Sequence, residues 1–280
     1  MKKSLFALPL LALASACHGS HKASGTVGLI VTDAPVSFEE VQSATLQIDR
    51  VTIDGGAFSL AAPRVLYKGA PVSVELTSLR NGAARLLFSR KLPVGTYRRL
   101  HVHITGGELQ LTGGRTFSTA DGSMQLPQTE STGFEVTIET PLEVTADHWS
   151  RLMVDIDVPR SFLPQGSEEF PLATSVLLQP LLHAVRPGQT GEIRGLVTQA
   201  DKQGHPAPVA DATLFFLPAG TQDLELAAGS TGTDADGSYT KLGLPPGTYD
   251  VLVQKAGASA TSNSCLVTAA GYSIVDINLP

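Results

Sequence analysis

The chain has 280 residues, enough for one or two domains that each bury a hydrophobic core. Its 27 glycines and 18 prolines indicate many turns, which is typical of an all-β protein. A net charge of −6, with only 16% charged residues, excludes the strongly basic surface on which nucleic-acid-binding proteins depend.

Residues 1–16 have the pattern of a secretory signal peptide. Two lysines near the start are followed by an apolar run from Leu5 to Leu13 and then by small residues that precede Cys17. The apolar run is too short to span a lipid bilayer. We therefore expect an exported protein from which this segment is removed.

The small residues before Cys17 resemble the bacterial lipobox, in which the cysteine is lipidated and becomes the first residue of the mature chain. Position −3 carries Ala14 where leucine is usual, and an ordinary signal peptide cut near Ala16 is the alternative. Acyl chains on Cys17 would anchor the protein to a membrane, with residues 17–24 as the lipidated cysteine and a short polar tether. The resemblance to lipoprotein sorting signals implies the outer membrane or cell surface rather than the inner membrane, because His18 follows the cysteine.

The second cysteine, Cys265, has no partner for a disulfide once Cys17 is acylated. An exported protein without an internal disulfide must be held together by its hydrophobic cores. We interpret Cys265 as a small buried apolar side chain, with a reactive thiol as the alternative.

One short sequence occurs twice and divides the chain. Leu92-Pro-Val-Gly-Thr-Tyr97 returns as Leu244-Pro-Pro-Gly-Thr-Tyr249. Proline and glycine predict a turn, and the Thr-Tyr pair that follows favours a strand. Each copy therefore marks a separate sheet domain. We expect the first domain over 25–186, a linker over 187–190 and the second domain over 191–280.

Strand-like alternation runs through most of the first domain. It shifts by one residue near Asp49-Arg50, which predicts a β-bulge, and Gly113-Gly114 between two alternating arms predicts a hairpin. In the run 152–158, Asp155 and Asp157 alternate with apolar residues, so they are expected on the face away from the core. The second domain shows short strands at regular spacing, which predicts a small sandwich. The expected fold class is all-β, with two consecutive antiparallel β-sandwich domains.

Four motifs stand out in the second domain: Gly191-x-Ile193-x-Gly195-x-Val197, Val209-Ala-Asp-Ala212, Thr233-Asp-Ala-Asp-Gly-Ser-Tyr239 and Leu242-x-Leu244-Pro-Pro-Gly-Thr-Tyr249. Together they resemble the carboxypeptidase regulatory-like family. The resemblance covers 191–280 and implies a prealbumin-like β-sandwich.

Four motifs stand out in the first domain: Thr32-Asp-Ala-Pro35, Leu92-Pro-Val-Gly-Thr-Tyr97, Leu152-Met-Val-Asp-Ile-Asp157 and Gln179-Pro180. In this order they resemble domain of unknown function family 4382, which is found in bacterial lipoproteins. The resemblance implies a surface-exposed lipoprotein with no known activity. It offers no catalytic residues to carry over.

Two pairs of residues have the chemistry of metal ligands. His101 and His103 flank Val102 in an expected strand, so their rings share one face, as a two-histidine metal site needs. The sequence identifies no third ligand, and a solvated strand face is the alternative.

The second pair is Asp155 and Asp157, whose carboxylates would suit calcium if Asp33 and Asp147 approached them. The polar face of a half-buried strand is the alternative for this pair.

No serine-nucleophile, phosphate-loop, Cys-x-x-Cys or His-Glu-x-x-His motif is present, so we expect no enzyme and no cofactor. The first hypothesis is a non-enzymatic, membrane-anchored surface lipoprotein that acts as a binding, adhesion or structural module of the cell envelope. Its expected partners are the membrane, through acylated Cys17, and an envelope protein, matrix or polysaccharide. The alternatives are a carbohydrate-binding protein, on fold analogy alone, a metal-dependent hydrolase centred on His101 and His103, and an assembly factor for another exported protein.

Overall fold

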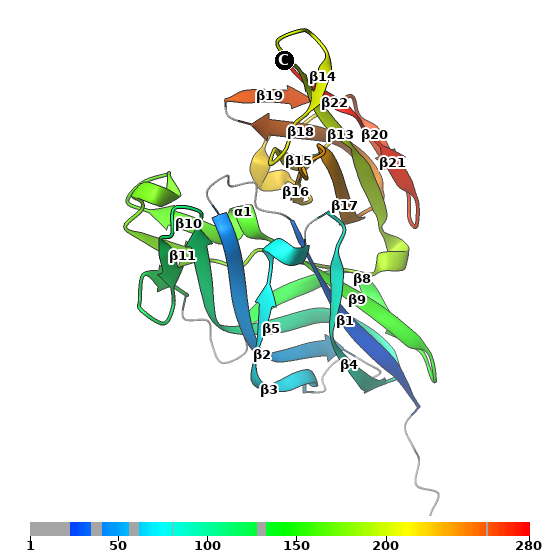
Figure 1. Cartoon of the computed structure of the whole chain (residues 1–280). Helices are drawn as coiled ribbons and strands as arrows, with labels where there is room; N and C mark the ends of the chain where they lie inside the picture. The colour runs from blue at the N-terminus through cyan, green and yellow to red at the C-terminus, as the bar shows by residue number, and fades with distance from the viewer. Residues whose placement is uncertain (1–22, 35–40, 56–61, 80, 128–132, 256) are drawn as a thin grey trace, which may run out of the picture.

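The computed structural model describes residues 23–34, 41–55, 62–79, 81–127, 133–255 and 257–280. Within these residues, two β-domains follow one another along the chain, and the C-terminal domain rests on one end of the N-terminal domain (Figure 1). Each domain has its own hydrophobic core. Cys17 and nearly all of the expected tether lie outside the described part of the chain. No helix in that part is long and apolar enough to cross a membrane.

The N-terminal domain is built almost wholly of strands. They are β1 (Ser24–Ala34), β2 (Val41–Gly55), β3 (Arg64–Glu75), β4 (Ala84–Pro93), β5 (Gly95–Leu111), β6 (Thr116–Ser118), β7 (Met124–Gln125), β8 (Phe134–Val144), β9 (Trp149–Asp157), β10 (Phe162–Gln165), β11 (Ser175–Leu178) and β12 (Leu182–Val185). The short helical elements are η1 (Thr77–Leu79), α1 (Val158–Ser161), η2 (Phe170–Leu172) and, in the linker, η3 (Pro187–Gln189).

The main sheet of this domain curls around its core. Its strand order is β3-β2-β5-β8-β12-β9-β1-β4, with β6 added to β5. The two ends of this order approach each other, because Tyr67 of β3 stacks on Phe88 of β4 with ring centroids 4.1 Å apart. A small sheet, β10-β11-β7, contributes Phe162 and Met124 to the same core.

Strand β9 has one face in the core and the other beneath the C-terminal domain. Val154 and Ile156 belong to the core, and Asp155 and Asp157 point the opposite way, as the alternation predicts. Both carboxylates are nevertheless buried, at 3% and 0% exposure. The alternative of a polar face on a half-buried strand is therefore wrong for this pair, because the second domain covers this end of the sheet.

The C-terminal domain is a small sandwich of two sheets. Its elements are β13 (Gly191–Ala200), β14 (Pro206–Pro208), β15 (Thr213–Pro218), η4 (Leu224–Leu226), β16 (Ser230–Gly232), β17 (Ser238–Leu244), β18 (Gly247–Lys255), β19 (Ala258–Thr261), β20 (Cys265–Val267), β21 (Tyr272–Ile274) and β22 (Ile277–Leu279). One sheet has the order β14-β13-β17 with β21 and β22 on β13, and the other has β16-β15-β18-β19 with β20 on β18. The all-β fold class is thereby confirmed.

The repeated hexapeptide forms the same tyrosine bond in both domains. The hydroxyl of Tyr97 donates to the carbonyl of Pro93 over 2.9 Å, and that of Tyr249 donates to the carbonyl of Pro245 over 2.9 Å. Both tyrosines are buried and pack in their respective cores. In both copies a tyrosine near the start of a strand is therefore hydrogen-bonded to the turn that precedes the strand, as in the tyrosine corner of other β-sandwiches.

Local expectations hold better than long-range ones. The bulge near Asp49-Arg50 is confirmed by register shifts of β2 between Ile48 and Arg50 against both of its neighbours. The hairpin is confirmed, because β5 and β6 pair across Gly113-Gly114. Not every pairing is antiparallel, however, since β9 pairs with β1 in parallel.

Candidate functional site

The two histidines of β5 bind separate aspartates of β2. Nε2 of His101 lies 2.9 Å from Oδ2 of Asp54, and Nδ1 of His103 lies 2.6 Å from Oδ1 of Asp49. Among the described residues, no group of three or more histidine, cysteine, aspartate or glutamate side chains could hold a metal ion. The structure therefore supplies no third ligand that the two rings would share.

The proposed calcium ligands do not converge either. Asp147 lies in the turn before β9, so the length of that strand separates it from Asp157. The side chain of Asp33 is outside the described set. Asp155 and Asp157 instead contact side chains of the C-terminal domain.

A buried ion pair links the two domains. Nζ of Lys241, on β17, lies 2.5 Å from Oδ2 of Asp155, on β9. Both residues are 3% exposed. Lys241 is two positions along β17 from Tyr239, whose ring is in the sandwich core, so its aliphatic stem shares the inward face. The charged end of an otherwise internal side chain thus crosses to the other domain.

A glycine makes room for this lysine. A Cβ atom at Gly229 would lie 2.6 Å from Cε of Lys241 and 2.9 Å from its Nζ, closer than real Cβ contacts. Oδ1 of Asp155 is buried and has no hydrogen-bond partner within the described residues. The pair is therefore tightly enclosed, and Asp155 depends on Lys241 for the compensation of its charge.

Asp157 forms a second link between the domains. Its Oδ2 accepts from Nε and Nη2 of Arg160, over 3.0 Å and 2.7 Å, and from Oγ of Ser230 in the C-terminal domain, over 3.3 Å. The same guanidinium reaches further, donating from Nη1 to the carbonyl of Leu224 and from Nη2 to that of Ala227. Asp157 also accepts from the backbone N–H of Arg160 and so caps the first turn of α1.

Asn81 makes a third link, at the edge of β17. Its Oδ1 accepts from the backbone N–H of Thr240 over 2.9 Å, and its Nδ2 donates to the carboxylate of Asp234. The N-terminal domain thus covers part of a strand edge that would otherwise present unpaired backbone groups.

His183 of β12 completes the arrangement. It lies opposite Asp155 in the β12–β9 register, and its Nε2 is buried without a hydrogen-bond partner in the described part of the chain. Burial lowers the pKa of His183, and the ammonium of Lys241 lowers it further, while the carboxylate of Asp155 acts in the opposite direction. The imidazole is therefore neutral near pH 7.

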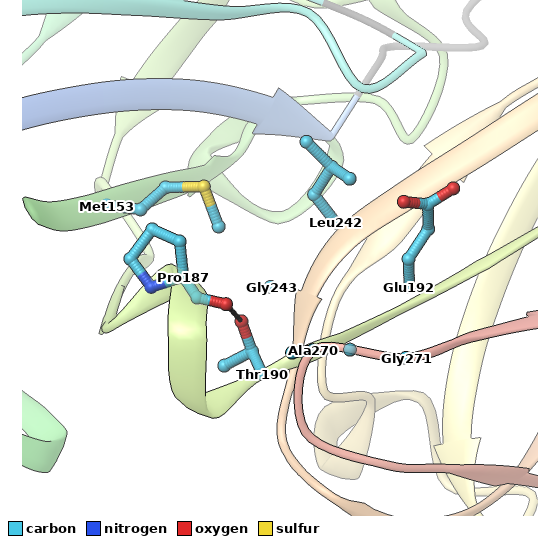
Figure 2. Close-up of a pocket in the computed structure, with 9 residues that line it drawn as sticks. Met153, Pro187, Thr190, Glu192, Leu242, Gly243, Ala270 and Gly271 are labelled. Carbon is cyan, nitrogen blue, oxygen red and sulfur yellow. Dashed lines mark hydrogen bonds between the residues drawn. The ribbon is translucent and has the colours of Figure 1, made fainter.

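We call six of these residues the interdomain polar cluster: Asp155, Asp157, Arg160, His183, Ser230 and Lys241. A cavity of about 170 Å³ lies beside the cluster, where Gly243 of β17 faces Met153 of β9 next to the linker residue Pro187 (Figure 2). None of the six cluster residues lines this cavity. A small molecule bound in this cavity would therefore contact none of the charged cluster residues. The cluster is better suited to holding the two domains together than to catalysis.

Cys265, the other candidate for chemistry, is partly buried and packs against the core of the C-terminal domain. Burial raises the pKa of its thiol, and the nearby carboxylate of Asp250 raises it further. A thiol held in its neutral form is a poor nucleophile, which agrees with the interpretation as an apolar side chain.

Sequence reasoning found Asp155 and Asp157 but missed their partners Lys241, Arg160 and His183. One signal was available, because Lys241 occupies an inward position on β17, two residues from a core tyrosine. A lysine at such a position requires a buried partner or an exit to solvent. Nothing local indicates which partner it finds.

Comparison with known proteins identifies both domains. The family model described as "Domain of unknown function (DUF4382)" matches residues 24–173, and that described as "Carboxypeptidase regulatory-like domain" matches residues 192–280. No curated protein matches the chain.

Several solved structures of bacterial proteins show weak similarity. They include the TIE protein of Bacillus anthracis (12% identity, TM-score 0.24, 91% of this chain and 34% of that one) and GBS52, the minor pilin of Streptococcus agalactiae (10%, 0.27, 90% and 94%). A third is BcpA, the major pilin subunit of Bacillus cereus (8%, 0.25, 91% and 70%). This chain spans about a third of the TIE protein. Scores this low establish no common fold over the whole chain, and nothing about its function follows from them.

Proposed function

We propose that this chain, which belongs to the family of the domain of unknown function DUF4382 and carries a carboxypeptidase regulatory-like domain, is a non-enzymatic structural module of the cell envelope. The observation that carries the proposal is the interdomain polar cluster, because it joins the two domains through charged side chains that are largely buried. The chain acts by holding one β-domain in a fixed position on another.

Domains joined by a short linker usually move relative to each other unless their interface is large or specific. Here three separate links fix the C-terminal domain: Lys241 on Asp155, the Arg160 guanidinium on the backbone carbonyls beside η4, and Asn81 on the edge of β17. A buried ion pair contributes little net stability compared with apolar packing, but any domain arrangement that separates the partners and leaves either charge buried is costly. The links therefore favour a single domain orientation.

Such a rigid unit would work as a spacer. The start of β1 and the C-terminal domain lie at opposite ends of the molecule (Figure 1). If Cys17 is acylated, the tether up to Ser24 reaches roughly 25 Å at most. The N-terminal domain would then stay at the membrane surface and present the C-terminal sandwich outward, to an envelope protein, matrix or polysaccharide.

Lipid anchoring is tested by replacing Cys17 with serine in the full chain in its native host. The parent should enter the membrane fraction, incorporate an alkyne-labelled fatty acid and show the mass of acyl chains on the cysteine. The C17S variant should lose the label and the membrane fractionation while keeping its folded domains. A parent that is soluble and unlabelled would overturn the anchoring part of the proposal.

The hydrolase alternative gains no support from the geometry, because His101 and His103 each bind their own aspartate. Zinc titration followed by calorimetry tests it directly. Binding that His103→Ala abolishes would favour this alternative.

A further inference from the structure

The start of β9 is not covered by the C-terminal domain, and it holds the only tryptophan of the chain, Trp149. A Cβ atom at Gly28 of β1 would lie 2.7 Å from Cζ2 and 3.3 Å from Cε2 of this indole. The ring therefore rests on the bare backbone of β1 at Gly28. Because Trp149 is still 52% exposed, part of the indole surface remains open to solvent.

Trp149 borders an open pocket of about 550 Å³ between β9 and the linker element η3. Two arginines line it, Arg151 from β9 and Arg186 from the end of β12, together with Gln189. Arg186 donates from Nη1 to the carbonyl of Pro141 over 3.1 Å, which fixes its position. None of the residues that line the pocket is acidic. The pocket is thus electropositive in a chain whose net charge is −6.

We propose that this pocket binds a carboxylated sugar, a hexuronate residue of an acidic polysaccharide. An exposed aromatic face is the surface on which the C–H groups of a sugar ring stack. Arginine guanidinium groups match a carboxylate through paired, charge-assisted hydrogen bonds. Trp149 and Arg151 are two residues apart on β9, so their side chains project from the same face of the strand. The stacking surface and the positive charge therefore lie side by side.

The place of the pocket agrees with an envelope polymer as the ligand. Trp149 lies opposite Thr26 in the parallel register of β1 and β9, close to the residues that follow the expected tether. The identification of the polymer with the envelope rests on the proposed function. Recognition of the uronate itself rests only on Trp149 and the arginines. The other occupant that an exposed tryptophan with arginines would suit is an anionic membrane surface, and the concave shape of the pocket favours the sugar.

The single tryptophan makes the test direct, because its fluorescence reports on this pocket alone. The full mature chain, carrying Cys17→Ser to keep it soluble, is titrated with oligogalacturonate and, in parallel, with neutral galactose oligomers of the same length. We expect oligogalacturonate to shift the tryptophan emission to the blue in a saturable way. We expect neutral oligomers to bind at least about tenfold more weakly.

Variants are then compared by calorimetry with the same two sugars. Trp149→Ala and Arg151→Gln should each weaken oligogalacturonate binding about tenfold or more, and Trp149→Tyr should retain most of it. The matched control is Tyr272→Ala, which removes an aromatic ring that is 60% exposed and does not line the Trp149 pocket. Like Trp149 it has an arginine nearby, because Cζ of Arg194 lies 3.8 Å from the centroid of the Tyr272 ring. It should leave binding unchanged. Circular dichroism confirms that each variant is folded.

The proposal would be overturned by the absence of a saturable signal at millimolar oligogalacturonate or by equal affinity for the neutral and acidic oligomers. Binding that Arg151→Gln and Trp149→Ala leave intact would overturn it as well. Phosphatidylglycerol vesicles supply the comparison with a membrane surface, and a Trp149→Ala defect confined to vesicles would also overturn it. None of these outcomes bears on lipidation of Cys17, so failure here is distinguishable from failure of the proposed function.

Discussion

Replacing Asp155 with alanine would leave the ammonium of Lys241 buried without its carboxylate. Both partners are 3% exposed and Gly229 packs closely against the end of the lysine, so the ammonium is shielded from bulk solvent. Removal of one partner of a buried ion pair costs about 3–5 kcal/mol. For a chain of this size, that loss corresponds to a fall in melting temperature of roughly 6–20 °C.

The assay is urea denaturation of the full chain followed by far-ultraviolet circular dichroism, with calorimetry as a second probe. The parent should unfold with both domains coupled, whereas Asp155→Ala should lose stability and separate the unfolding of the two domains. The double variant Asp155→Leu, Lys241→Met replaces both charges with apolar groups and should recover most of the loss, because no unpaired charge remains. If Asp155→Ala differed from the parent by less than about 1 kcal/mol, the reasoning on a closed ion pair would be refuted.

Three further predictions concern single side chains. Tyr97→Phe and Tyr249→Phe should each lower the free energy of unfolding in urea by about 1 kcal/mol, because each leaves a proline carbonyl without its hydroxyl donor. Unchanged midpoints of urea denaturation would refute a stabilising role for these two hydrogen bonds. Burial lowers the pKa of His183 in the folded chain, so the contribution of this histidine to stability is constant above its ordinary pKa of 6.5. Below pH 6.5 the contribution falls by at most about 1.4 kcal/mol per pH unit until the folded-state pKa is reached. Stability curves of the parent and His183→Gln against pH should diverge in that window, and coincident curves would contradict this. Gly229→Ala should lower the free energy of unfolding by about 1–3 kcal/mol because the added methyl group displaces Lys241. Gly113→Ala is the control and should lower it far less, because a Cβ there would meet nothing within 4 Å. Equal losses of stability in thermal melts would show that the space at Gly229 is unimportant.

Local sequence patterns predicted the parts of the fold that depend on neighbours along the chain. The alternation of β9, the bulge of β2 and the Gly113-Gly114 turn each follow from the period of a strand or from turn chemistry, and each is confirmed. The parallel pairing of β1 with β9 joins residues more than a hundred positions apart. No local pattern carries that information.

The candidate site shows the same division. The sequence placed Asp155 and Asp157 on the outward face of β9, but it could not show that a second domain covers that face. Whether a carboxylate on a strand meets water or an ammonium depends on how the domains pack. The ammonium that Asp155 meets belongs to Lys241, more than eighty positions later in the sequence. Conversely, His101 and His103 have the right spacing for a metal pair, yet each is bound by an aspartate that only the β2–β5 register brings to it.

The claim that the two domains form one rigid unit is tested most directly by the distance between them. Spin labels at Arg90→Cys in β4 and Lys202→Cys in the C-terminal domain occupy exposed positions, in a chain carrying Cys17→Ser and Cys265→Ser. Pulsed electron resonance should give one narrow distance distribution, no broader than that of two labels within a single domain, and Asp155→Ala should broaden it. A broad or multimodal distribution in the parent would contradict the rigid unit.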